Sequence, residues 1–145
     1  MTRRAFAIGL ALLALPAGAA EPAAAEYAVG QVWLYQIRPA DQGSLLRIAA
    51  IEESPVGAIY HVSLVGIKLT CRDDATEVAH LPVSAQTLRQ SLTAPSSSAT
   101  EFPAAEEGIA EWRKAEGGVF TISVAEIANV LEQSICRNET AGAGE

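Results

Sequence analysis

The chain has 145 residues, of which half are hydrophobic, and its 17 acidic against 10 basic side chains give a net charge of −7 at pH 7. This acidic balance argues against binding to nucleic acid or to an anionic membrane surface, because phosphate groups recruit Lys and Arg. The length is enough for one hydrophobic core.

The N-terminus has the features of a signal peptide in the expected order. Arg3 and Arg4 precede an uncharged apolar run over positions 5–15, and Pro16 then breaks it. That run is shorter than the roughly 20 residues that a membrane-spanning helix needs. Positions 2–6 also match the start of a twin-arginine export signal, so the export route stays open between the general and the twin-arginine pathway.

Small residues at the end of the leader predict cleavage after Ala19 or Ala20, so that residues 1–20 are the signal peptide. The mature chain, residues 21–145, is then a single domain with its core over about 28–137. Loss of the two leader arginines takes the net charge from −7 to −9. No later apolar run is long enough to span a bilayer, and we expect a periplasmic or secreted protein without membrane insertion.

Three successive strands are predicted in the first half of the mature chain, because β-branched and aromatic residues alternate there between short turns. They cover residues 31–38, 44–52 and 58–69, and their short connections favour antiparallel pairing. Apolar residues change face at Gly66, which predicts a bulge or bend. Both faces of the third strand carry apolar residues, so the second face should also be covered, by helices or by a partner.

The second half of the mature chain reads mainly as helix and loop. A short fourth strand over 76–81 should end at Pro82, and Ser84 should cap a helix over 85–92. Residues 93–100 resemble a flexible loop, 104–116 a helix, and 119–122 a short strand. A capping box at Ser123 and Glu126 opens a helix to about Arg137, after which we expect disorder. The predicted fold is α+β: an antiparallel sheet of about four strands with two or three packed helices.

Cys71 and Cys136 are the only cysteines. An even number in an exported chain predicts a disulfide. The closed loop, with a sequence separation of 65, would stabilise the domain by about 4 kcal/mol on the chain-entropy model. A redox thiol and a zinc site with both histidines are alternatives, but there is no C-x-x-C and the spacing matches no compact ligand pattern. We predict no metal and no cofactor.

Several stretches together resemble a family of small uncharacterised exported bacterial proteins. They are residues 30–35, Arg38-Pro39, 44–48, His61-Val62-Ser63, Gly66, His80-Leu81-Pro82 and 119–126. The resemblance covers most of the mature domain. It implies a shared fold, and it carries no catalytic residue to this chain.

His61 and His80 are the only histidines, on two predicted strands that could be neighbours. As a pair they could act as general acid and base, or each could be a structural or surface histidine. Glu52-Glu53 is a carboxylate pair, but adjacent residues point in different directions, which favours solvated side chains. The signatures of common enzyme classes are absent from the sequence.

Arg38, Tyr35 and Tyr60 are the candidate binding residues, since Arg and aromatic side chains dominate recognition surfaces. The aromatic residues could equally belong to the core. We therefore expect an exported, non-catalytic domain that binds a partner protein or a small ligand. Two alternatives remain open: a small hydrolytic enzyme that uses His61 and His80, and an inhibitor or immunity-type protein for a basic target.

Overall fold

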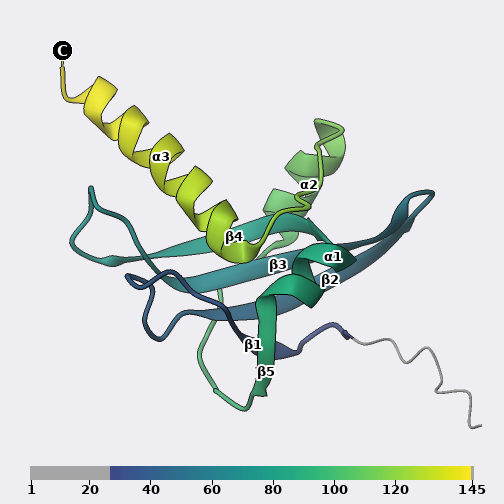
Figure 1. Cartoon of the computed structure of the whole chain (residues 1–145). Helices are drawn as coiled ribbons and strands as arrows, with labels where there is room; N and C mark the ends of the chain where they lie inside the picture. Colours follow the sequence, from purple (N-terminus) through teal and green to yellow (C-terminus); the bar gives the residue numbers. More distant parts are fainter. Residues whose placement is uncertain (1–26, 145) are drawn as a thin grey trace, which may run out of the picture.

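The computed structural model describes residues 27–144, so the predicted leader (1–20) and residues 21–26 lie outside the described residues. One antiparallel sheet of five strands, in the order β4-β3-β2-β1-β5, carries three helices (Figure 1). The elements are β1 (Val32–Tyr35), β2 (Leu45–Ser54), β3 (Gly57–Lys68), β4 (Ala75–Ser84), α1 (Ala85–Ser91), β5 (Leu92–Ser96), α2 (Glu106–Lys114) and α3 (Val124–Gly142). The α+β prediction is confirmed, with one strand more than expected.

The first face of the sheet holds the main apolar core. Side chains at alternating positions of the strands point to this face, where α1 and α3 pack on them. Strands and helices both contribute side chains that are fully excluded from solvent, namely Leu46, Ile48, Val62, Leu64, Val83, Leu88, Val124 and Ile127. This layer therefore supplies most of the hydrophobic stabilisation.

The predicted bulge at Gly66 is confirmed, and it keeps the end of β3 in this core. The β3–β4 register shifts between Leu64 and Ile67, and Gly66 has a φ of 82°. A Cβ atom at position 66 would lie 3.0 Å from the Cα of Ser44, so glycine also permits the close approach of the neighbouring chain. Ile67 and Leu69 are buried in the first-face core as a result.

The second face is covered by α2 and by the segment that leads into it. Ala105 and Ile109 are buried there, and the Arg47 guanidinium lies over the ring of Phe102, 5.3 Å from its centroid. The expectation that both faces are covered is confirmed, since helices provide the cover on each side. This second layer is thinner and more polar than the first.

β4 does not end at Pro82 as predicted, but continues to Ser84. A proline has no N–H to donate, so an edge strand tolerates it where its backbone nitrogen points away from the neighbouring strand. β4 is such an edge, and the Pro82 carbonyl accepts a hydrogen bond from the Phe120 N–H on the outer side. The strand predicted over 119–122 is reduced to this single contact, a parallel bridge between Val83 and Phe120.

Residues 93–100 were expected to form a loop, and the structure corrects this at its beginning. Leu92–Ser96 form β5, which pairs antiparallel with β1. The composition of this segment has little strand preference. The unpaired edge of β1 supplies the hydrogen-bonding partners that local sequence cannot reveal.

α3 begins as predicted at a capping box. Ser123 accepts from the Glu126 N–H, and the Glu126 carboxylate accepts from the Ser123 N–H. The helix continues to Gly142 and not to about Arg137, which corrects the expected disorder beyond Asn138. Figure 1 shows α3 leaving the sheet at an angle, with its C-terminal end apart from the other elements.

The predicted Cys71–Cys136 disulfide is present, with the two Cα atoms 5.5 Å apart. It joins the loop between β3 and β4 to the middle of α3. Among the described helices, none combines the length and the apolar character needed to cross a membrane.

Candidate functional site

The two histidines meet across neighbouring strands. His61 lies on β3 and His80 on β4, with 2.8 Å between His61 Nδ1 and His80 Nε2 and 5.0 Å between the ring centroids. His61 and Val62 point to opposite faces, so the pair lies on the second face, beneath α2. The sequence placed the histidines on two strands that could be neighbours, and in the structure these strands pair and the two rings come within hydrogen-bonding distance.

α2 closes over this pair. Trp112 packs its ring edge-on against His61, 5.0 Å from centroid to centroid, and His61 is completely excluded from solvent. Gly108 faces His80 so closely that a Cβ atom there would lie 2.6 Å from the His80 Cβ. Only glycine lets the helix approach to this distance. A substrate could reach His61 only if α2 moved.

Glu52 on β2 extends the pair at the His61 end. Its Oε2 lies 3.6 Å from His61 Nε2, and the same carboxylate forms an ion pair with Arg113 of α2. A proton on His61 Nε2 would point at this carboxylate, and His61 Nδ1 would then accept from His80 Nε2–H. This tautomer best matches donors to acceptors. At 3.6 Å the carboxylate is too far for a hydrogen bond, so His61 Nε2 has no hydrogen-bond partner among the described residues and only the two imidazoles are bonded to each other.

Burial lowers the pKa of both histidines below the ordinary value of 6.5, and the neighbouring His61 lowers that of His80 further. Both imidazoles are therefore neutral at pH 7, when one ring can donate and the other accept. Two hydrogen-bonded imidazoles beside a carboxylate can store or pass a proton. With α2 docked, His61 is excluded from solvent, whereas His80 stays partly exposed.

Arg38 is an internal anchor in this structure, at the end of β1. Its guanidinium donates to both carboxylate oxygens of Asp41, at 2.6 and 2.9 Å, to Glu132 at 2.6 Å and to the Lys68 carbonyl at 2.7 Å. Arg38 is 8% exposed and Asp41 is fully buried. The adjacent carboxylate of Asp41 raises the pKa of Arg38 above its ordinary value. These contacts tie β1 and β3 to α3.

Tyr35 and Tyr60 also face the first core and not a common surface with Arg38. Ser44 donates its hydroxyl to the Val65 carbonyl and so accepts from the Tyr35 hydroxyl at 2.5 Å. Burial raises the pKa of Tyr35 to about 12. The partly buried Tyr60 packs edge-on against Tyr27, with 5.7 Å between ring centroids.

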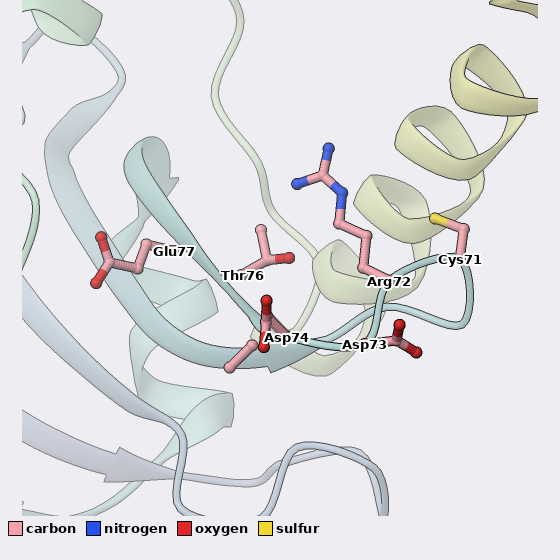
Figure 2. Close-up of a pocket in the computed structure, with 7 residues that line it drawn as sticks. Cys71, Arg72, Asp73, Asp74, Thr76 and Glu77 are labelled. Carbon is pink, nitrogen blue, oxygen red and sulfur yellow. The ribbon is translucent and has the colours of Figure 1, made fainter.

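A third region, which we call the disulfide junction, consists of the loop and strand start at residues 70–77 together with residues 132–142 of α3. A surface hollow of about 650 Å³ is lined by residues 71–77 (Figure 2). The Thr70 N–H donates to Glu132 at 2.6 Å, and Arg72 forms an ion pair with Glu139. The bond from Thr70 lowers the pKa of Glu132.

The carboxylates beside this hollow are spread along the chain. Figure 2 shows Asp73, Asp74 and Glu77 pointing to separate places, all at exposed positions. Across residues 27–144, no group of three or more His, Cys, Asp or Glu side chains could hold a metal ion.

Sequence reasoning identified the histidines and the cysteines but missed Glu52, Trp112 and Arg113 as neighbours of the pair. Glu52 and Trp112 are far apart in sequence, and only the packing of α2 on β2 and β3 brings them together. The Glu52 side chain was expected to be solvated. It is partly exposed, but its carboxylate also lies near His61 and pairs with Arg113.

Comparison of the chain with protein-family models, with curated proteins and with solved structures gives no match. The resemblance to small exported bacterial proteins stays a prediction. Any functional proposal rests on the chemistry of the described residues.

Proposed function

We propose that the mature chain is an exported, non-catalytic domain that binds a partner protein through the disulfide junction. The observation that carries this proposal is the way the junction is held. A covalent bond between Cys71 and Cys136, an ion pair between Arg72 and Glu139 and the hydrogen bond from Thr70 hold an exposed loop against α3 at the border of the core.

Rigidity of this kind benefits recognition as well as folding. The fully buried side chains of α3 lie near its start and are Val124, Ile127 and Ala128. Its side chains from residue 137 onward are exposed. Fixing an exposed surface in advance removes part of the ordering cost of association. The disulfide also fits an oxidising compartment outside the cytoplasm, in agreement with the signal peptide expected over residues 1–20.

Charge indicates the kind of partner. Asp73, Asp74 and Glu77 have no ion-pair partner among the described residues, and the expected mature chain has a net charge of −9. A cationic segment of another protein complements such a surface and would associate faster because of it. The inhibitor or immunity-type alternative shares this chemistry and would be one form of the same proposal.

The hydrolase alternative is less well supported by the geometry. His61 is fully buried and Gly108 packs against the partly buried His80, so His61 cannot contact a substrate while α2 is docked. A general base must come within hydrogen-bonding reach of the proton that it removes. His80→Gln should therefore leave any hydrolytic activity of the preparation unchanged.

Site-specific photo-crosslinking in cells that naturally make the protein tests the proposed surface. A photoreactive residue at the exposed Ala75 position should give a discrete adduct with one protein. The same residue at Val56, which is 94% exposed at the opposite end of β3, should not. Asp73→Asn with Asp74→Asn should weaken the adduct at position 75. Equal labelling from both positions, or none from position 75, would overturn the proposal.

Export is tested separately by the mature N-terminus. Mass spectrometry of the protein from its own cells should find a chain that begins at Ala20 or Glu21. An intact Met1 on the abundant form would refute the predicted cleavage, and with it the proposed compartment.

A further inference from the structure

α2 is held on the sheet by a small number of contacts. Ile109 is its one buried side chain, Trp112 and Gly108 contact the histidines, and Arg113 pairs with Glu52. The N-cap residue, Ala105, makes no side-chain hydrogen bond to the helix. Elements with few buried contacts and weak caps open locally at a lower free energy than the core.

The connections on both sides of α2 allow it to move as a unit. Residues 97–100 lie between β5 and the packed segment 101–105 that leads into the helix, and the Gly117–Gly118 pair follows it. Trp112 donates its indole N–H to the Gly118 carbonyl at 2.9 Å, so the turn after the helix closes on the same side chain that covers His61. Undocking would move α2 together with residues 101–105, so it would also release Phe102 from Arg47 and expose Ala105.

We propose that α2 is a pH-sensitive lid: protonation of the His61–His80 pair releases α2 and uncovers the second face of the sheet. This proposal rests on the packing of α2 over the two imidazoles, and it does not depend on the proposed binding function. The moving part is α2, and the sensor is the imidazole pair directly beneath it.

The hydrogen-bond geometry explains the effect of each proton. In the neutral pair, His80 Nε2–H donates to His61 Nδ1 across 2.8 Å. A first proton can enter on His80 Nδ1 and keeps that bond, although it puts a charge under the helix. A second proton leaves an N–H on both facing nitrogens. The bond is then replaced by repulsion between two cations, which costs far more where water is excluded.

The charged groups around the pair come from two elements. Glu52 of β2 faces His61 Nε2 and would favour a positive charge, but its carboxylate is already paired with Arg113 of α2. Arg47 lies on the same face of β2, with its guanidinium directed to Phe102 and the Pro103 carbonyl. β3 and β4 contribute the two imidazoles themselves. Desolvation, rather than a nearby carboxylate, therefore dominates.

The sign of the pH dependence follows from the lowered pKa of each histidine. With α2 docked, the pair binds fewer protons than it does when solvated. Docking is therefore unaffected above about pH 6.5, and it weakens as the pH falls from there toward the lowered values. Acid should open the lid, and neutral pH should close it.

Hydrogen exchange of the full mature protein, read by mass spectrometry, tests the lid. Between pH 7.5 and 5.0, after correction for intrinsic chemical rates, the opening constant of α2 amides should rise about tenfold, since proton uptake can change it by up to tenfold per proton and pH unit. Amides of α1, which caps the first face, should change little over the same range.

His80→Gln provides the matched variant, because it keeps a side-chain N–H for His61 and removes one titrating ring. Its α2 amides should show a clearly smaller rise. Titration of both imidazoles by NMR in the unmodified protein gives a second readout that needs no substitution. Equal rises in α1 and α2, an undiminished rise in His80→Gln, or imidazoles that titrate at 6.5 or above would each overturn the lid.

Discussion

The two faces of the sheet are built from alternate residues of the same strands, yet they are held in different ways. Under α1 and α3, aliphatic side chains form a continuous core that is tied by Arg38 and by the Cys71–Cys136 disulfide. Under α2, a histidine pair and a tryptophan take the place of that core. The first face can hold the fold alone, and the second can respond to its surroundings.

This difference follows from the chemistry of burial. Apolar contacts do not depend on pH, so the aliphatic core of the first face is insensitive to the protons of the medium. Two neutral imidazoles can be buried together only while they share one hydrogen bond. The polar face is therefore less stable and more easily changed, which is the usual location of elements that move.

Arg38→Met should cause the largest loss of stability, because it leaves the fully buried Asp41 carboxylate without its ion-pair partner. Removing one member of a buried pair costs about 3–5 kcal/mol. Urea unfolding measures the loss. Arg72→Met is the control, because its pair with Glu139 is exposed and such pairs contribute about 1 kcal/mol or less. Equal losses would show that Arg38 does not anchor the first face.

Cys71→Ser combined with Cys136→Ser should cost about 2–4 kcal/mol, since the bridge closes a loop with a sequence separation of 65. The melting temperature should fall by several degrees. α2 amides should keep their pH dependence, because the bridge lies on the other face. A melting temperature unchanged by the double substitution would show that the disulfide does not stabilise the fold.

Gly108→Ala should weaken the second face by about 1–3 kcal/mol, because the added methyl group overlaps His80. The loss should appear as faster hydrogen exchange in α2 alone. Gly142→Ala is a matched control in α3, since a Cβ there meets nothing within 4 Å. If both substitutions behave alike, α2 does not pack on His80 as described.

Ser123→Ala should have the smallest effect, about 1 kcal/mol, through loss of the capping box at the start of α3. Thermal unfolding measures it. A melting temperature equal to that of the unchanged protein would show that the capping box does not stabilise the start of α3.

The sequence was sufficient for features that local chemistry determines. The capping box at Ser123, the bulge at Gly66 and the pairing of the only two cysteines each need no knowledge of distant residues. β5 could not be foreseen, because Leu92–Ser96 become a strand only through the free edge of β1. The continuation of β4 beyond Pro82 could not be predicted either, because it depends on the contact of this strand with Phe120.

The candidate site divides in the same way. The strand pattern placed His61 and His80 on two strands that could be neighbours. The positions of Glu52 and Trp112 depend on how α2 docks, which no local pattern encodes. Arg38 illustrates the reverse problem, since an arginine beside aromatic residues suits a binding surface and an internal anchor equally well in sequence.

A matched pair of buried charges tests most directly whether the first face alone holds the fold. Ile127 of α3 and Ile109 of α2 are both buried, at 0% and 7% exposure, on opposite faces. Under the present account, Ile127→Asp abolishes cooperative urea unfolding at pH 7. Ile109→Asp retains it with a loss of about 1–3 kcal/mol, in the range of ordinary single substitutions. Loss of the cooperative transition in Ile109→Asp as well would contradict the account, because α2 would then be part of the core and not a lid.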